Sequence, residues 1–378
     1  MTVKVFELAQ NQEFCFEVNE NQTIEIRVEC GLGEIKGREL IIDKWYVFTD
    51  IKTSIFTFTG CKLSVDDRDD PVLCYISHSS VFPHIFNFFH EIKDLDENNL
   101  NILVLGTGRS TFTATLSNYF LRLHRNVLLT EIDLSKGNIF PGTVSTMIVE
   151  NLIEDYFSIN NPYCLFYGST EIKNKELYET QMKLVRDRVI EQRKEFLLPN
   201  FIIGMFWESS MLQKTIDIFK VNKIVVIGNE RLFHKLDVKI PKYFIENSNY
   251  IYENTIGKSI KRYFNGTPSM VFKPCRIMLN RNIISIIKLN EDFMAPESAL
   301  PLGTARKSGV SGLVEVENMS ENIVMSISET DNKDKVFTTP SMGFVVCIDE
   351  KKGRILACQP KIPKCNYLVY GDFKYIDL

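Results

Sequence analysis

Apolar and polar residues alternate along the first eighty positions of the chain. The apolar positions of two such segments are Phe14, Phe16 and Val18, and then Ile24, Ile26 and Val28. Turn sequences follow at GLGE (31–34) and TGC (59–61). A period of two with frequent turns is typical of antiparallel strands that bury one face. The pattern therefore predicts an N-terminal antiparallel β-domain.

The pattern changes at about residue 79 to a helical one, and strands then alternate with helices up to about residue 270. The predicted strands are ILVL (102–105), NVLLTEID (126–133), NFIIGMF (200–206) and KIVVIG (223–228). An amphipathic segment over 171–196 is predicted to be a long helix. Alternating strands and helices are typical of βαβ units and a parallel sheet.

Short strands return in the last hundred residues, at MGFVVCID (342–349), GRILACQ (353–359) and NYLVYGDFKYIDL (366–378). The predicted fold class is α/β, a central parallel sheet with helices flanked by N-terminal and C-terminal β-rich domains. The predicted boundaries are 1–90 for the N-terminal β-domain, 91–268 for the central domain and 269–378 for the C-terminal domain.

The formal charge is −4, whereas a free-standing nucleic-acid-binding domain usually has a basic excess. Contact with RNA would thus come through partners or a local patch. Five basic residues of the predicted helix could contact RNA. Because Glu and Asp residues are interleaved with them, the pattern favours an ordinary solvated helix face. These cations are Lys183, Arg186, Arg188, Arg193 and Lys194.

No secretory signal pattern is visible at the amino terminus, and no apolar run approaches the length of a membrane span, so we expect no membrane association. The nine cysteines are scattered without a CxxC pair. This usage favours reduced thiols in a cytosolic or nuclear protein, without a zinc site or a disulfide framework.

The stretch NILVLGTGRSTFTATL (101–116) has the order of a phosphate-binding loop: a buried strand, glycines, a basic residue, Ser and Thr, and a helix. A P-loop, GxxxxGK[ST], wraps a phosphate in backbone N–H groups at a helix N-terminus. Here Gly106 and Gly108 are one residue apart rather than four, and Arg109 replaces the lysine. A planar guanidinium does not replace a compact ammonium. By itself the stretch favours a structural turn.

Seven stretches together resemble the Clp-type polynucleotide 5′-hydroxyl kinase family, whose eukaryotic members are subunits of pre-mRNA cleavage complex II or cleavage factor IA. They are FELAQNQEFCFEV (6–18), IFTFTGC (55–61), NYFLRLHRNVLLTEIDLSKGNIFPGT (118–143), FYGST (166–170), IVVIGNERL (224–232), ALPLG (299–303) and YLVYGDFKYIDL (367–378). They occur in family order over nearly the whole chain. The resemblance implies a P-loop kinase-like central domain between two β-domains.

The resemblance also implies roles for individual residues. Gly106, Thr107, Gly108, Arg109, Ser110 and Thr111 occupy the position of the phosphate loop, which is shortened, with Ser110 placed to meet Mg²⁺ through a nucleotide. The implied cofactors are ATP and Mg²⁺, bound weakly or not at all.

Asp133 matches the catalytic aspartate, and Lys136 stands where the family has glutamine. Phosphoryl transfer needs such a carboxylate to orient the attacking hydroxyl, but a strand-end carboxylate can equally cap a turn. Glu13 and Lys52 match residues beside the nucleotide base, although both could be ordinary surface charges.

Two further family elements are weakly represented. The lid segment ENTIGKSIKRYFNG (253–266) has Glu253 and Ile256 near the expected arginine positions, and the clasp over the RNA end survives only as Trp207.

Two functions follow. The favoured one is a non-catalytic scaffold of the nuclear pre-mRNA 3′-end cleavage and polyadenylation complex, with a partner subunit docked on the central domain. The other is an active ATP-dependent RNA 5′-hydroxyl kinase in mRNA or tRNA processing, with Asp133 as the base. A P-loop GTPase has little support, because no NKxD-type motif is present.

Overall fold

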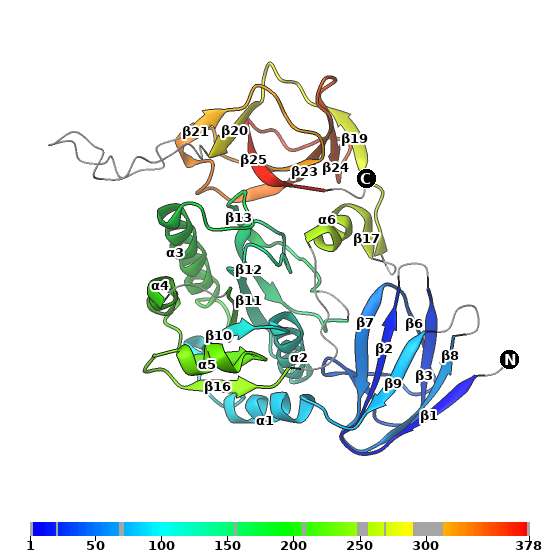
Figure 1. The fold of residues 1–378 in the computed structure, drawn as a ribbon. Coiled ribbons are helices and arrows are strands. Elements are labelled where there is room, and N and C mark those ends of the chain that lie inside the picture. The colour runs from blue at the N-terminus through cyan, green and yellow to red at the C-terminus, as the bar shows by residue number, and fades with distance from the viewer. Residues whose placement is uncertain are drawn as a thin grey trace. The chain divides into compact units, whose positions relative to one another are not determined.

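The computed structural model describes residues 3–19, 22–67, 72–154, 157–205, 209–247, 256–267, 270–289 and 313–375. The chain divides into two compact units. Unit 1 comprises 1–129, 147–160 and 192–253, and unit 2 comprises 130–146, 161–191 and 254–378. Figure 1 shows the ribbon coloured along the chain.

The N-terminal part of unit 1 contains two antiparallel sheets, with strand orders β1-β8-β3-β6 and β5-β4-β7-β2-β9. Their strands are β1 (Lys4–Leu8), β2 (Glu13–Val18), β3 (Ile24–Gly31), β4 (Glu34–Ile35), β5 (Arg38–Glu39), β6 (Trp45–Phe48), β7 (Ile51–Phe56), β8 (Cys61–Asp66) and β9 (Leu73–Ser77). One core cluster takes side chains from both sheets, including Phe14, Phe16, Ile24 and Ile26. The predicted alternation and its buried face are confirmed.

Helices and strands alternate after β9. They are α1 (Phe82–Ile92), η1 (Glu97–Asn99), β10 (Asn101–Gly106), α2 (Arg109–Arg122), β11 (Val127–Glu131), β12 (Thr143–Val149), β13 (Tyr163–Phe166), α3 (Lys175–Gln192), β14 (Asn200–Ile203), α4 (Ser209–Phe219), β15 (Lys223–Ile227), α5 (Glu230–Lys235), β16 (Lys242–Ile245) and α6 (Ile256–Asn265). The four predicted strands correspond to β10, β11, β14 and β15.

The central sheet has seven strands in the order β13-β12-β11-β14-β10-β15-β16. β10 is parallel to both β14 and β15, and β15 is parallel to β16. β13 is antiparallel to β12. No helix lies between these two strands in the described part of the chain, and a parallel pair would need a crossover connection.

Unit 2 ends in a second seven-stranded sheet, ordered β19-β24-β23-β22-β25-β20-β21. The remaining elements are β17 (Gly266–Thr267), β18 (Met270–Val271), β19 (Cys275–Met278), β20 (Ser285–Leu289), β21 (Leu313–Glu315), β22 (Ile323–Ser328), η3 (Lys333–Lys335), β23 (Ser341–Asp349), β24 (Arg354–Ala357) and β25 (Tyr367–Lys374). Its core includes Ile286, Met325, Val345 and Leu368. The predicted fold class is confirmed.

Candidate functional site

The loop between β10 and α2 contains only Thr107 and Gly108. Gly106 and Gly108 have φ angles of 96° and 82°, in the left-handed region that glycine enters at little cost. A Cβ added to Gly106 would lie 2.1 Å from the carbonyl oxygen of Ile227. The end of β15 therefore packs directly against this loop, and a tight turn results.

The polar groups of the loop bond mainly to the protein itself. The Thr107 N–H donates to the Ile227 carbonyl at 3.0 Å. Nη1 of Arg109 donates to the Gly106 carbonyl at 2.6 Å. The amides of the first helical turn and the Ser110 hydroxyl are the donors that a phosphate could still meet there.

The contacts of residues 106–111 differ from those of a loop that binds a triphosphate with Mg²⁺. A P-loop curls several successive amides around the β-phosphate and extends a lysine to the β- and γ-phosphates. Here two residues form the connection, the first amide bonds to β15, and the arginine bonds to the loop's own carbonyl. This turn does not form a triphosphate cradle.

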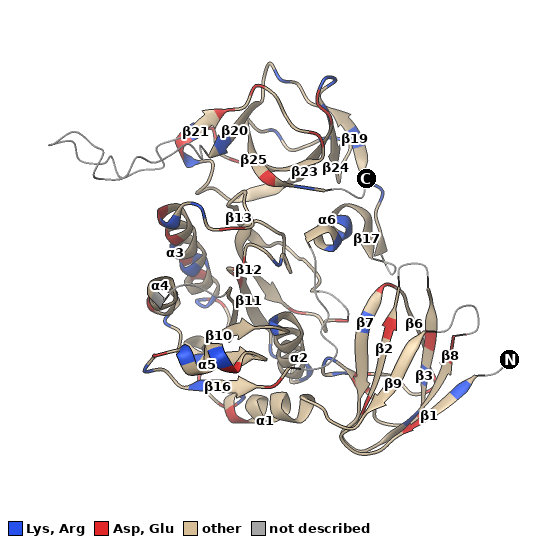
Figure 2. Ribbon diagram, in the orientation of Figure 1, with Lys and Arg blue, Asp and Glu red and all other residues tan. Residues whose placement is uncertain are grey.

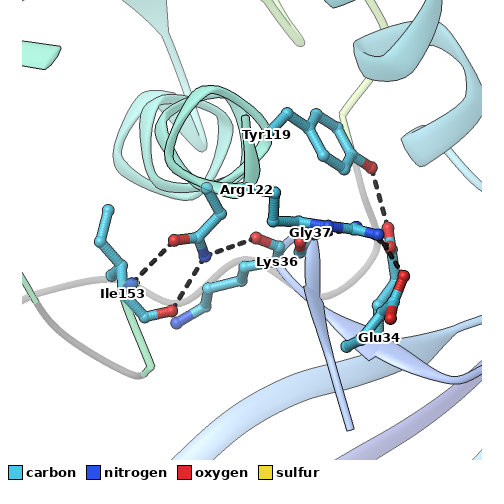
Figure 3. Close-up of polar contacts among 8 residues, drawn as sticks. Glu34, Lys36, Gly37, Tyr119, Arg122 and Ile153 are labelled. Carbon is cyan, nitrogen blue, oxygen red and sulfur yellow. Dashed lines mark hydrogen bonds and ion pairs between the residues drawn. The ribbon is translucent and has the colours of Figure 1, made fainter. Parts of the chain in front are cut away.

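Helix α2, which carries the loop at its start, is held near its other end by a buried carboxylate on β4. The Tyr119 hydroxyl donates to Oε1 of Glu34 at 2.8 Å, and Nη1 of Arg122 lies 3.1 Å from Oε2 (Figure 3). Burial raises the pKa of Glu34, and the tyrosine and arginine oppose that rise. The contacts fix the β4–β5 hairpin to the helix.

A second set of bonds involves Asn118, the residue before Tyr119. Its Nδ2 donates to the carbonyls of Lys36 at 2.8 Å and Ile153 at 2.9 Å, and its Oδ1 accepts the Ile153 N–H at 2.7 Å (Figure 3). A Cβ on Gly37 would lie 2.9 Å from the Tyr119 ring. The hairpin turn thus packs tightly against α2, and no pattern in the sequence indicates this contact.

Glu13 and Lys52 lie on the same face of the β2–β7 pair, because Lys52 is opposite Glu17 and Glu17 is four residues after Glu13 on the same strand. Glu13 is buried and accepts the Ser54 hydroxyl at 2.7 Å. Burial raises its pKa, which hydrogen bonds from Ser80, Ser54 and the Val81 amide partly offset. Nζ of Lys52 lies 3.3 Å from the Glu17 carboxylate.

The geometry therefore gives Glu13 and Lys52 different structural contacts. Glu13 is not a surface charge, since it bonds inside the N-terminal β-domain. Lys52 is half-exposed and forms an ordinary cross-strand ion pair. Their implied roles beside a nucleotide base stay predictions.

Asp133 follows β11 and is buried. Its Oδ1 accepts the Ser135 N–H at 3.0 Å and the Ser135 hydroxyl at 2.7 Å. These are the bonds of a turn-capping aspartate, the structural alternative to a catalytic base. The role of Asp133 as a base stays a prediction.

A second buried carboxylate, Glu131, lies two residues earlier and was not singled out from the sequence. It accepts Nδ2 of Asn138 at 2.7 Å and the Ile139 N–H at 3.0 Å. Glu131 and Asp133 thus both accept hydrogen bonds from the loop that follows β11 and stabilise it. The available signal was the predicted strand over 126–133, in which a spacing of two would place both acids on one face; in the structure the strand ends at Glu131 and Asp133 lies in the loop.

The segment that the resemblance assigns to the lid contains α6, which packs against this loop. The Ser259 hydroxyl donates to the Gly137 carbonyl at 2.8 Å, and Nη2 of Arg262 lies 3.4 Å from the Asn138 carbonyl. Glu253 and Trp207 lie outside the described residues. The described part of the lid therefore contributes one arginine to the edge of the Asp133 loop.

The same helix is bonded to the C-terminal sheet. The Tyr263 hydroxyl accepts the Phe344 N–H at 3.0 Å. The Phe344 ring stacks on Phe140, with centroids 3.5 Å apart and planes within 2°. An aromatic cluster thus joins the Asp133 loop, α6 and β23.

The described residues contain no group of three His, Cys, Asp or Glu side chains that could hold a metal ion. The helices described in this structure include none long and apolar enough to cross a membrane.

The fold defines the chain as an α/β protein with flanking β-domains and a strand–loop–helix of P-loop order in its central sheet. Three family models match it, one after another along the chain. Residues 7–98 match the N-terminal beta-sandwich domain of polyadenylation factor, and 105–263 match the mRNA cleavage and polyadenylation factor CLP1 P-loop. Residues 272–377 match the pre-mRNA cleavage complex II protein Clp1. The chain belongs to the Clp1 family, as the resemblance indicated.

Curated relatives match over nearly their whole length. The Protein CLP1 homolog of Anopheles gambiae is 26% identical, over 98% of this chain and 97% of its own. The Polyribonucleotide 5′-hydroxyl-kinase Clp1 of Homo sapiens is 26% identical, over 99% and 96%.

Two solved structures have the same fold. The wild-type Clp1p–Pcf11p complex matches with a TM-score of 0.81 and 16% identity, over 100% of this chain and 99% of that one. A second structure matches with a TM-score of 0.79, 16% identity and 99% coverage of each chain. It describes an extended interface between Pcf11p and Clp1p and the basis of ATP loss in a point mutant.

Proposed function

We propose that this protein is a subunit of the nuclear pre-mRNA 3′-end cleavage and polyadenylation complex, and that it acts as a scaffold with weak or no ATP binding and no kinase turnover. The observation that carries the proposal is the two-residue connection between β10 and α2, in which Thr107 and Arg109 bond to protein carbonyls.

The physical reason is the way phosphoryl transfer is catalysed. Positioning and electrostatic stabilisation supply nearly all of that catalysis. A loop that lacks the amides that wrap the phosphate and the lysine of the P-loop provides neither the positioning nor the electrostatic stabilisation. Asp133 is retained, but its carboxylate accepts hydrogen bonds from Ser135. It can therefore stabilise the turn without acting as a catalytic base.

The proposed partner is the counterpart of the Pcf11p chain that accompanies Clp1p in the solved complexes. We propose that it docks on the central region, residues 91–268, and that the assembly acts in the nucleus. RNA would reach the complex through the partner or through a local patch of this chain.

The proposal is tested by transfer of labelled γ-phosphate from ATP to a 5′-hydroxyl RNA oligonucleotide. The human relative, which bears the name of a kinase, is the positive control. We expect no transfer by this protein while it still captures its cleavage-complex partner. Transfer that the Asp133→Ala substitution abolishes would overturn the proposal.

The second candidate function is an active RNA 5′-hydroxyl kinase. It is favoured by the names of relatives such as the human one and by the position of Asp133 two residues after β11 of the central sheet. It requires the phosphate cradle to be rebuilt by a different path of residues 106–111 when ATP binds. The same transfer assay distinguishes the two functions.

A further inference from the structure

Basic residues are concentrated from just before β15 to the start of β16, in a chain whose formal charge is −4. Residues 220–242 contain six Lys or Arg and two Asp or Glu, which are Glu230 and Asp237. Four of the cations are exposed. We call these four the basic stripe: Lys220, Arg231, Lys235 and Lys239.

The topology brings most of the stripe to one edge of the central sheet. β15 and β16 are parallel neighbours, with Ile224 opposite Lys242. Lys220 and Lys239 each lie three residues before the first residue of their strand. Since the amino ends of parallel neighbours lie at the same edge of a sheet, these two lysines lie at that edge together.

Helix α5 adds the other two cations. Nζ of Lys242 donates to the carbonyls of Phe233 and Leu236 at 2.9 Å each, so the end of α5 lies beside the start of β16. Lys235 is at that end, and Arg231, four residues earlier, lies on the same helical face. Figure 2 shows basic residues on α5.

Ion pairing distinguishes the stripe from the basic residues of α3. In α3, Lys183 pairs with Glu179 at 2.9 Å, Arg186 with Asp187 at 2.8 Å and Arg188 with Glu191 at 2.6 Å. These three residues thus have the ion pairs of an ordinary solvated face. Arg193, which follows α3, differs: it is partly buried and donates to the carbonyls of Leu198 and Leu100. Within the described ranges, no carboxylate pairs with Lys220, Arg231 or Lys239.

The acids around the amino ends of β10 and β15 are engaged elsewhere. Glu91 accepts Nζ of Lys223 at 3.3 Å, Asp94 lies 3.5 Å from Nζ of Lys93, and Glu97 lies 2.6 Å from Arg125. These three acids are thus paired with cations outside the stripe. The acids left beside it include Asp217, whose Oδ1 accepts the Gln213 amide at 3.0 Å, as well as Glu230 and Asp237. The stripe keeps a net positive field.

From this arrangement we infer that the basic stripe is a docking surface for single-stranded RNA. Exposed lysines contact phosphates as point charges. An exposed aromatic side chain between the cations, His234, offers a face on which an unpaired base stacks. The neighbouring Phe233 ring is already covered by Nζ of Lys242, 4.8 Å from its centroid. This mixture favours a nucleic-acid strand over an acidic peptide, which has no bases to stack.

The surface is separate from the phosphate loop. Gly106 and Ile227 pair at the carboxyl ends of β10 and β15, whereas the stripe lies mainly at their amino ends. RNA could therefore be held by this chain without phosphoryl transfer. The inference is independent of whether residues 106–111 bind ATP.

The test measures binding of the full-length protein to a fluorescein-labelled 15-nucleotide single-stranded RNA by fluorescence anisotropy over a series of salt concentrations. The stripe variant carries Lys220→Gln, Arg231→Gln and Lys239→Gln. The matched control carries Lys183→Gln, Arg186→Gln and Arg188→Gln on α3, with the same loss of charge. Circular dichroism verifies that both variants are folded.

We expect the stripe variant to bind at least about tenfold more weakly, and the slope of log K against log salt to fall by about 2, as three lost phosphate contacts predict. The α3 control should stay within about twofold of the unsubstituted protein. Equal losses in the two variants, or unchanged binding by the stripe variant, would overturn the inference. Polyglutamate that competes as well as unlabelled RNA would identify an acidic peptide surface instead and would also overturn it.

Discussion

The Tyr119 hydroxyl donates a hydrogen bond of 2.8 Å to the carboxylate of Glu34, a residue 85 positions earlier in the chain. Glu34 is only 4% exposed, and Arg122 is its second partner. A β-hairpin of the N-terminal domain is thereby bonded to the helix that starts at the shortened phosphate loop. The N-terminal β-domain and α2 consequently form one packed body within unit 1.

This bond predicts a stability cost for Tyr119→Phe. The substitution removes a donor from a buried carboxylate, which costs about 1–3 kcal/mol when the acceptor loses that partner. Chemical denaturation measures the loss. Tyr243→Phe is the matched control, since its hydroxyl bonds to the exposed Glu91, and it should cost less than about 1 kcal/mol. Equal costs in the two variants would contradict a special role for the Glu34 contact.

Gly106→Ala is expected to destabilise the protein by more than about 3 kcal/mol, because a positive φ and a backbone clash act together. The new Cβ would lie 2.1 Å from the Ile227 carbonyl oxygen. Gly353→Ala serves as the control: its φ is also positive, at 61°, but its nearest neighbour is 3.5 Å away. Unfolding by denaturant should show a loss of about 1–2 kcal/mol in the free energy of unfolding for the control. A mild effect at Gly106 would mean that the loop moves easily away from β15.

Glu13→Gln should change how stability depends on pH. Burial raises the pKa of Glu13 above its ordinary value of 4.5, so folding favours the protonated carboxyl. The unsubstituted protein should therefore lose stability relative to the variant as the pH rises from below 4.5 through the raised pKa. Denaturation of both proteins at several pH values measures this difference.

Glu29→Gln provides a control of opposite sign. The Ser64 hydroxyl and then Lys62 lower the pKa of Glu29, so its contribution is lost as the pH falls through that lowered pKa. The two substitutions should shift the pH profile in opposite directions. Shifts of the pH profile in the same direction for both variants would contradict burial as the cause of the raised pKa of Glu13.

Arg109→Lys alone is expected not to create ATP binding. The substitution restores the lysine of the P-loop pattern, but the connection remains two residues long and the Thr107 amide still bonds to Ile227. Isothermal titration with ATP and Mg²⁺ is the measurement. Binding in the micromolar range by this variant would show that the arginine, rather than the loop length, prevents a nucleotide from binding.

The sequence by itself determined the elements and the class of the protein. Periods of two and alternating strand and helix patterns identified β2, β10, β14 and β15, because these patterns reflect which neighbouring residues are buried. The spacing of Gly106 and Gly108 already indicated a shortened loop, and the seven ordered stretches indicated the family. Each strand, helix and loop signal, and each of the seven stretches, is read from residues that are contiguous in the sequence.

The tertiary structure decided which polar groups are buried and what they bond to. Glu13 reads as a surface charge on a strand, yet its carboxylate is enclosed and bonded to Ser54. Asp133 reads as a base or a cap, and its contacts with Ser135 come from the fold of the loop. Glu34 meets Tyr119 only because two distant segments pack together. The energy of a buried carboxylate depends on donors brought from elsewhere in the chain, and no local pattern records them.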